Sequence, residues 1–206
     1  MKADDFGRRL PHRRKLKKGE QGLRQLVLLD TLDAFEARHE HLRQMARENL
    51  CRWSAAVAVH GSSNAQRQCH VEAVPDDWGD VTLSLTKKYG VAFAVLNMAN
   101  ACVPGGGYVD GMAAQEENMF RRTDCHFSLR KECMSSNGAY RSEVSSLLNA
   151  ENGRVYCDTD HPRICVRGPE DLNDARLGYA WLPDNQIFHF FELRAAAPDL
   201  RDRPCT

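Results

Sequence analysis

The stretch NMANACVPGGGYVDGMAAQEENMFRR, from Asn97 to Arg122, joins three consecutive glycines to a Gln-Glu-Glu triplet through a spacer of seven residues. Each glycine in a helix or strand interior costs roughly 0.5–1 kcal/mol relative to alanine, so three in succession predict a loop. Two adjacent carboxylates repel each other where both are ionised and poorly hydrated. Both choices are unfavourable for stability alone, and together they indicate a ligand-binding site.

The residues around the glycines predict a strand, a loop and a helix in that order. The nearly all-apolar run 91–99 is typical of a strand covered on both faces in an α/β sheet. Residues 112–123 contain helix formers and no breaker. A glycine loop that enters a helix presents backbone N–H groups to an anion. Asn97 and Asn100 would face a ligand at the carboxyl end of the strand.

Each of these features also has a purely structural interpretation. A lone GGG can be a bare turn, and this one matches neither the dinucleotide G-x-G-x-x-G pattern nor a Walker loop. Asparagines often act as turn or cap residues. Acidic residues such as Glu116 and Glu117 are common in the first turn of a helix, where they are usually solvated.

The whole motif resembles the signature of poly(ADP-ribose) glycohydrolases, in which GGG is followed by six to eight residues and then QEE. The flanking VLNMANACVPGGG, QEENMFRRT and FHFFELRAAAPDLR resemble the microbial-type branch of that family, over roughly residues 80–200. The resemblance implies an α/β fold of the macrodomain type, three-layer α/β/α with a mixed sheet. The family's second glycine-containing phosphate loop has no match here, so the last strands would be lacking and the domain partial at its C-terminus.

The resemblance also implies roles for individual residues. Six residues are expected to bind substrate: Asn100, Gly105, Gly106, Gly107, Asp110 and Gln115. The glycines would hold the diphosphate of ADP-ribose through backbone N–H groups, and Asn100 would bond the distal ribose. Glu117 matches the family's catalytic glutamate, and Glu116 matches the one that helps to hold the ribose or its linkage.

The implied reaction is cleavage of an O-glycosidic ribose bond in ADP-ribose polymers or conjugates. A carboxylic acid protonates the leaving oxygen while an oxocarbenium ion develops, and the same group then activates water. A neighbouring like charge and partial burial raise one pKa of a carboxyl pair, which keeps this proton available near neutral pH. The mechanism requires no cofactor and no metal, and no metal-ligand spacing is visible in the sequence.

Three other functions remain open at this point. GGGYVDG together with NMAN also resembles the loop of macrodomain mono-ADP-ribosyl hydrolases, in which Asp110 would be the catalytic or water-orienting acid. The chain could instead bind ADP-ribose without cleaving it. It could also be an inactive structural or interaction protein.

Composition sets broad limits on partners and location. Lys+Arg and Asp+Glu both number 28, so net charge gives no reason to expect nucleic-acid or membrane binding. The basic segment 1–22 predicts a disordered tail, followed by a single domain over 23–206. Cys102, Cys157 and Cys165 are expected to be reduced thiols of a cytoplasmic or nuclear protein. The expected partner is ADP-ribose or poly(ADP-ribose) on a modified protein, and the chain is expected to be a monomer.

The remaining elements follow from hydrophobic periodicity. Residues 24–52 predict one long amphipathic helix or two short ones. Strands are predicted at 81–85, around 154–157 and 163–167, and at 187–197, with a polar loop before the last. The order predicts one α/β domain.

Overall fold

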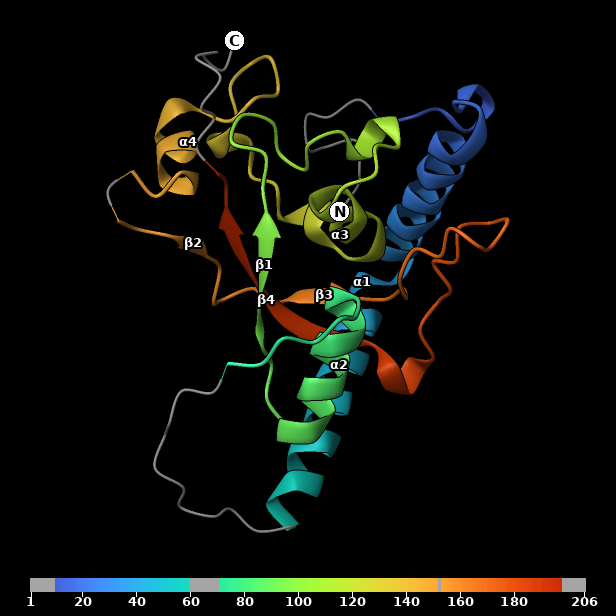
Figure 1. Ribbon diagram of the computed structural model, residues 1–206, viewed down its shortest axis with the longest axis vertical. Coiled ribbons are helices and arrows are strands. Elements are labelled where there is room, and N and C mark those ends of the chain that lie inside the picture. Colours follow the sequence, from blue (N-terminus) through green and yellow to red (C-terminus); the bar gives the residue numbers. More distant parts are fainter. Residues whose placement is uncertain (1–9, 60–70, 152, 198–206) are drawn as a thin grey trace.

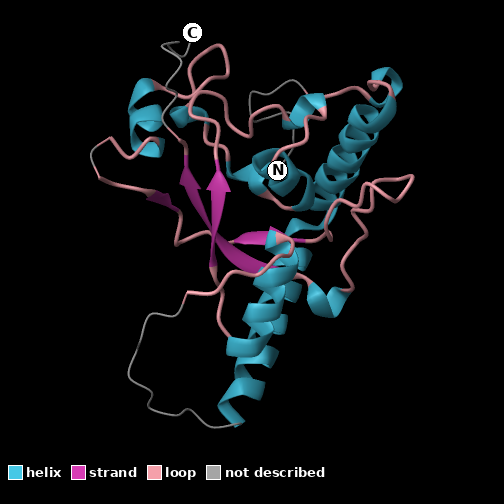
Figure 2. Cartoon of the chain, viewed as in Figure 1, coloured by secondary structure: helices cyan, strands magenta, loops and turns pink. Residues whose placement is uncertain are grey.

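The computed structural model describes residues 10–59, 71–151 and 153–197. Within these ranges the α-helices are α1 (Gly19–Val59), α2 (Trp78–Tyr89), α3 (Gln115–Arg122) and α4 (Ser142–Leu148). The strands are β1 (Ala94–Met98), β2 (Tyr156–Cys157), β3 (Arg163–Cys165) and β4 (Phe188–Ala195). The predicted α/β class is confirmed (Figures 1 and 2).

The strand β4 organises the sheet. β1 pairs with it in parallel, from Ala94 opposite Phe191 to Met98 opposite Ala195. β2 and β3 both pair with β4 antiparallel, β2 near its end and β3 near its beginning. The sheet is therefore mixed, as predicted. Because β1 and β4 run in parallel, their carboxyl ends meet at one edge, and the glycine loop begins there (Figure 1).

The core lies between the helices and one face of β4. Leu28 and Leu32 of α1 are buried in one cluster with Phe120 of α3 and with Phe190 of β4. The helix α1 is broken at Arg38, whose φ and ψ of −148° and 33° are not helical. Beyond this break its side chains enter a second cluster, so the helix spans two parts of the core. No helix in the described residues is long and apolar enough to span a membrane.

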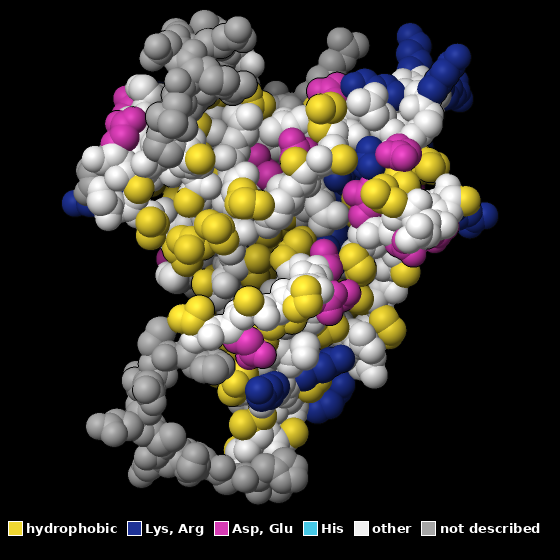
Figure 3. Space-filling model, in the orientation of Figure 1, with side chains coloured by type: hydrophobic (Ala, Val, Ile, Leu, Met, Phe, Trp, Pro, Cys, Tyr) yellow, Lys and Arg dark blue, Asp and Glu magenta, His cyan; other side chains and the backbone are white. Residues whose placement is uncertain are grey.

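The other face of β1 is open in the described part of the chain. Val95 and Asn97 are buried, whereas Leu96 and Met98 are 48% and 63% exposed. The prediction that this run is covered on both faces is therefore wrong for the described residues. Figure 3 shows hydrophobic side chains gathered over this part of the sheet.

The predicted strand at 81–85 is wrong, because these residues lie inside α2. Their β-branched side chains favoured a strand, but the helix has strong signals at both ends. The carboxylate of Asp77 accepts hydrogen bonds from the N–H groups of Gly79 and Asp80, which caps the N-terminus. Gly90 ends the helix with a left-handed φ of 66°. The caps outweigh local strand propensity.

The N-terminal segment is ordered earlier than predicted. Residues 1–9 lie outside the described residues, but Leu10 already packs against the core. A short 3-10 helix follows at Arg13–Lys15, and α1 begins at Gly19. Described structure therefore begins within the range 1–22 that was expected to be a disordered tail.

The cysteines only partly follow the prediction. Cys165 is a buried free thiol and Cys157 an exposed one. Cys102 is disulfide-bonded, so the expectation of a reduced thiol is wrong at this position. Over residues 10–59, 71–151 and 153–197, no group of His, Cys, Asp or Glu side chains is arranged to hold a metal ion.

Candidate functional site

The glycine loop joins β1 to α3, and a Cβ added at any of its three glycines would meet a neighbouring side chain. A Cβ on Gly105 would lie 2.6 Å from the ring of Tyr108, and one on Gly107 would overlap the side chain of Met112. A Cβ on Gly106 would collide with Oε1 of Glu117. Gly105 and Gly106 also have left-handed φ values of 72° and 54°. The loop therefore packs directly against the start of α3.

The N–H groups of this loop point at the two glutamates. Gly105 donates to Oε1 of Glu116 at 3.0 Å, and Gly107 donates to Oε1 of Glu117 at 2.8 Å. Gly106 donates to a carbonyl within the loop. A diphosphate would thus compete with two carboxylates for these donors. The diphosphate-binding role of the glycines stays a prediction, and the role that the geometry supports is to hold the acids.

The two glutamates are both buried, with 3% of Glu116 and 8% of Glu117 exposed, but they are held differently. Both oxygens of Glu116 accept backbone hydrogen bonds, from Gly105 and, at 2.8 Å, from Asn100. Glu117 accepts only through Oε1. Its Oε2 has no hydrogen-bond donor among the described residues. Glu116 is therefore held through both oxygens and Glu117 through one.

Glu116 titrates close to neutral pH. Burial is the largest cause that raises its pKa, which reaches about 7, and the charge of Glu117 adds to the rise. The N–H groups of Asn100 and Gly105 and the guanidinium of Arg194 act in the opposite direction. Neighbouring carboxyl groups of this kind lose their protons as a coupled unit.

Asn100 lies at the start of the loop and is exposed. Its side-chain oxygen accepts hydrogen bonds from the N–H groups of Cys102 and Val103, at 2.9 and 2.8 Å, and so forms the first turn. Its side-chain NH₂ group has no acceptor in the described part of the chain. The residue therefore shapes the loop and still offers a donor beside the carboxylates.

Gln115 bonds to the free edge of β1. Its Oε1 accepts from the N–H of Met98 at 2.9 Å, and its Nε2 donates to the carbonyl of Leu96 at 2.9 Å. These are the groups that a neighbouring strand would bond. The side chain thus fixes the start of α3 to the sheet, whereas its expected contact with substrate stays a prediction.

Asp110 is not joined to the glutamates by any hydrogen bond or ion pair in the described residues. It lies in the 3-10 helix Tyr108–Asp110, its side chain is 58% exposed, and it forms an ion pair with Lys17 at 3.4 Å. The structure thus assembles Asn100, the glycines, Glu116 and Glu117 at one place. Asp110 is turned toward the N-terminal segment.

Sequence reasoning missed a buried charged cluster next to this site. Glu192 accepts hydrogen bonds from Arg194 at 2.7 and 2.9 Å, from Arg163 at 2.9 Å and from Asn97 at 2.8 Å. Asn97 therefore points into the core, and the prediction that it faces a ligand is wrong. A signal was present, because a Glu and an Arg two positions apart in an apolar strand must share one face.

The chain is similar to proteins of one kind. The family described as "Microbial-type PARG, catalytic domain" matches residues 29–157. A poly(ADP-ribose) glycohydrolase (PARG) from Thermomonospora curvata is 21% identical with a TM-score of 0.48, and the match covers 87% of this chain and 68% of that one. The same enzyme bound to the inhibitor ADP-HPD is 20% identical with a TM-score of 0.46, covering 87% and 66%. No curated protein matches.

Proposed function

This chain belongs to the family of microbial-type poly(ADP-ribose) glycohydrolase catalytic domains, a glycosidase family, and on that premise we propose that Glu117 is its general acid and base. The substrate class is ADP-ribose polymers or ADP-ribosylated proteins. The bond cleaved is the O-glycosidic bond at the anomeric carbon of ribose.

The difference between the two glutamates is the observation that supports this role for Glu117. Both oxygens of Glu116 accept backbone hydrogen bonds, so neither is free to give a proton to a ligand. Glu117 is oriented by Gly107 through one oxygen and leaves Oε2 open. A general acid has to reach the leaving oxygen at about 2.6–3.2 Å. Of the four oxygens, Oε2 of Glu117 is the one without a hydrogen bond among the described residues, which supports this role.

In the proposed reaction Glu117 gives one proton to the leaving group and later receives one from water. Glu117 gives its proton to the leaving ribosyl oxygen as the bond from that oxygen to the anomeric carbon breaks. The positive charge on the sugar lies next to the ionised member of the carboxyl pair, which stabilises it. Water then adds to the anomeric carbon and its proton returns to Glu117. Bond breaking and bond formation balance without a cofactor.

Glu116 and the loop hold this arrangement in place. Fixed by two N–H donors, Glu116 cannot rotate away from Glu117, and Asn100 offers its side-chain NH₂ group to the ribose. Repulsion between the carboxylates and a bound diphosphate favours protonation of the pair. A proton is then available for the leaving oxygen when substrate is bound.

The test is release of ADP-ribose from poly- and mono-ADP-ribosylated protein, with ADP-ribose binding measured by calorimetry. Glu117→Gln should lower turnover at least about 100-fold while binding persists. Asp110→Asn is the matched control, because it removes a carboxylate of the same loop that is exposed and paired with Lys17.

Each alternative gives a different result. Loss of turnover in Asp110→Asn with retention in Glu117→Gln would assign the chemistry to Asp110. Binding of ADP-ribose by the wild-type chain without any release would indicate a binding module. Failure to bind would reject both an enzyme and a reader of ADP-ribose.

A further inference from the structure

The segment 169–179, which lies between β3 and β4, has a strained backbone at its end. Leu177, Gly178 and Tyr179 are three consecutive residues with positive φ values of 62°, 65° and 53°. Only glycine adopts this left-handed conformation without a steric cost, so Leu177 and Tyr179 are strained. Strain of this kind persists only where the surrounding structure enforces it, and it is concentrated at functional sites.

The main chain of Tyr179 is held by hydrogen bonds on both sides. Its N–H donates to the carbonyl of Pro169 at 2.9 Å, and its carbonyl accepts from the buried guanidinium of Arg167 at 2.8 Å. The segment, orange in Figure 1, also lies beside the first part of α1, where Glu170 pairs with Arg24 at 2.7 Å. These contacts fix the strained tyrosine in place.

The hydroxyl of Tyr179 joins three side chains. It accepts hydrogen bonds from Nε of Arg121 at 3.0 Å and from Nδ2 of Asn118 at 3.3 Å, and it donates to Oε2 of Glu170 at 2.7 Å. The guanidinium of Arg121 also lies over the tyrosine ring, 5.6 Å from its centroid. Arg121 and Asn118 belong to α3, the helix that carries the two glutamates. The strained segment is therefore linked directly to that helix.

Arg121 is a fully buried cation without an ion pair among the described residues. Its Nη1 donates to the carbonyl of Met112 at 2.8 Å, and its Nη2 has no partner in the described part of the chain. Burying a charge with neutral partners alone is unfavourable. The arrangement is therefore poor for stability, and it indicates that Arg121 matters for the groups that it holds.

The group that Arg121 holds leads to the proposed acid. The backbone N–H of Met112 donates to the carbonyl of Gly107 at 3.2 Å, and a Cβ on Gly107 would lie 2.5 Å from Cγ of Met112. Gly107 in turn donates its own N–H to Oε1 of Glu117 at 2.8 Å. A series of direct contacts thus runs from Tyr179 through Arg121 and Met112 to the hydrogen-bond donor of Glu117.

We propose that Tyr179 is a positioning residue of the reaction: its hydroxyl orients Arg121, which holds the turn that keeps the N–H of Gly107 on Glu117. The proposal rests on the function proposed above. Without the hydroxyl, the guanidinium has one hydrogen bond fewer and can move away from Met112. The N–H of Gly107 then loses its fixed direction, and the acid is less well aligned with the leaving oxygen.

The first readout needs no substrate. Tyr179→Phe removes the hydroxyl and keeps the ring, and hydrogen exchange of the Gly107 amide is followed by ¹⁵N NMR. The exchange rate should rise about tenfold, because the bond from this amide to Glu117 opens more often. In the assay for release of ADP-ribose, kcat should fall about tenfold while KM changes less than about twofold, because alignment of the acid is lost and substrate binding is kept.

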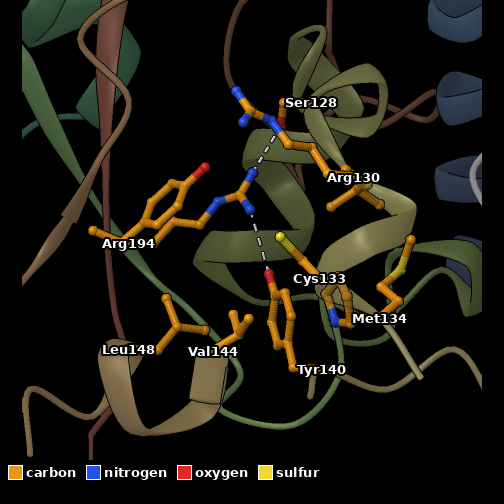
Figure 4. Close-up of a pocket in the computed structure, with 11 residues that line it drawn as sticks. Ser128, Arg130, Cys133, Met134, Tyr140, Val144, Leu148 and Arg194 are labelled. Carbon is orange, nitrogen blue, oxygen red and sulfur yellow. Dashed lines mark hydrogen bonds between the residues drawn. The ribbon is translucent and has the colours of Figure 1, made fainter. Parts of the chain in front are cut away.

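Tyr140→Phe is the matched control for the amide measurement. Figure 4 shows that Tyr140 is also a tyrosine whose hydroxyl accepts from a buried arginine, in this case Arg194 at 3.4 Å. Neither that hydroxyl nor the guanidinium of Arg194 bonds to α3 or to the glycine loop in the described part of the chain. This variant should leave exchange of the Gly107 amide at its wild-type rate, even where its thermal midpoint falls.

Arg121→Lys tests the same hydrogen bond from its other partner, so the result does not depend on the folding of one variant. The lysine keeps the charge and loses Nε, and exchange of the Gly107 amide should rise in this variant too. Adding Tyr179→Phe to Arg121→Lys should then have little further effect, because the bond between the two side chains is already absent.

An unchanged exchange rate of the Gly107 amide in Tyr179→Phe overturns the proposal. An equal rise in Tyr140→Phe does so as well, because the effect would then be one of general stability, and so does full additivity in the double variant. Faster exchange with an unchanged kcat overturns the role in the reaction. If the wild-type chain releases no ADP-ribose, the proposed function fails, and the amide measurement still decides whether Tyr179 holds the donor of Glu117.

Discussion

Gly106 lies against the side chain of Glu117, the proposed acid. A methyl group there would overlap Oε1 of Glu117, and the left-handed φ of 54° adds roughly 1–2 kcal/mol of strain for any other residue. We expect Gly106→Ala to displace the carboxylate and lower turnover at least about tenfold, with a smaller loss of stability. The measurements are the release assay and the thermal midpoint.

Gly168→Ala is the matched control for this substitution. A Cβ at Gly168 would meet only the carbonyl oxygen of Ala180, at the ordinary distance of 3.7 Å. It should leave both quantities nearly unchanged. Wild-type turnover in Gly106→Ala would show that the contact between loop and acid is not needed for catalysis.

His189 makes the stability of the chain depend on pH. Burial lowers its pKa to about 4, and its Nε2 has no partner in the described residues. Below pH 6.5 the imidazole is protonated in the unfolded chain but stays neutral in the folded chain. The contribution of neutral His189 to the free energy of unfolding is therefore complete above pH 6.5 and is lost as pH falls toward 4. Between pH 6.5 and 5 the loss should be about 2 kcal/mol. Urea unfolding at pH 7.5 and pH 5 measures it.

The variant His189→Leu should lose this component of the acid sensitivity. The difference between the two chains at both pH values removes the effect of the other titrating groups on the free energy of unfolding. One of these groups is Glu116, whose raised pKa makes the folded chain gain stability as pH falls from about 7. His41→Leu, at an exposed position of α1, controls for loss of an imidazole. An equal pH dependence of His189→Leu and wild type would contradict the prediction.

Individual site residues could be predicted where their partners are near in sequence. The spacing from Gly107 to Glu117 is short, so the motif itself indicated that loop and acids meet. Glu192 and Arg194 were missed because their partners on other elements, such as Asn97, lie far away in the chain. Which distant side chains are in contact depends on strand order and register, and neither can be predicted from a local sequence pattern.

At the scale of elements, α2 shows where local propensity fails. Its Val and Thr residues are good strand formers, yet Asp77 and Gly90 cap a helix around them. The carboxylate of Asp77 also binds the buried guanidinium of Arg122 on α3 at 2.9 Å. The cap was readable from Asp77 and Gly90, whereas the contact with α3 was not.

The attachment of α3 to β1 gives a prediction for Gln115. Gln115→Ala removes both hydrogen bonds to the edge of β1 and should lower the free energy of unfolding by about 1–2 kcal/mol. Turnover should fall too, because the two glutamates follow directly in the helix. Urea denaturation measures the first effect. Gln44→Ala, which removes an exposed bond to Glu48 within α1, should cost less than half as much, and equal costs would contradict the prediction.

At the scale of the whole molecule, the face of β1 that is open in the described residues is an apolar feature. Leu96 and Met98 project from it, and a groove of about 950 Å³ between α2 and β1, lined by Leu85, Tyr89 and Phe93 among others, continues it. A contiguous apolar surface of this kind favours association. We expect reversible self-association at high protein concentration, seen as a concentration-dependent sedimentation coefficient.

The double variant Leu96→Lys with Met98→Lys should suppress this association. About half of each side chain or more is exposed, so stability should change by about 1 kcal/mol or less. Leu172→Lys, in an exposed loop, serves as the control and should leave association unchanged. Association that persists in the double variant would place the contact elsewhere.

The class of fold was predictable because the order of elements and the apolar runs are strong signals. The open face was not, because an apolar strand such as β1 has the same composition whether one face or both are covered. Apolar residues show that a face of the strand can be buried. Whether that face is covered depends on where the other elements lie.

The two hydrogen bonds between Gln115 and β1 have a consequence for the loop that joins β1 to α3. Since one amide fastens the acidic helix directly to the strand, the alignment of the acids does not depend on the whole of the intervening loop. Away from the glycines, substitutions in that loop are therefore expected to leave the alignment of the two carboxylates unchanged.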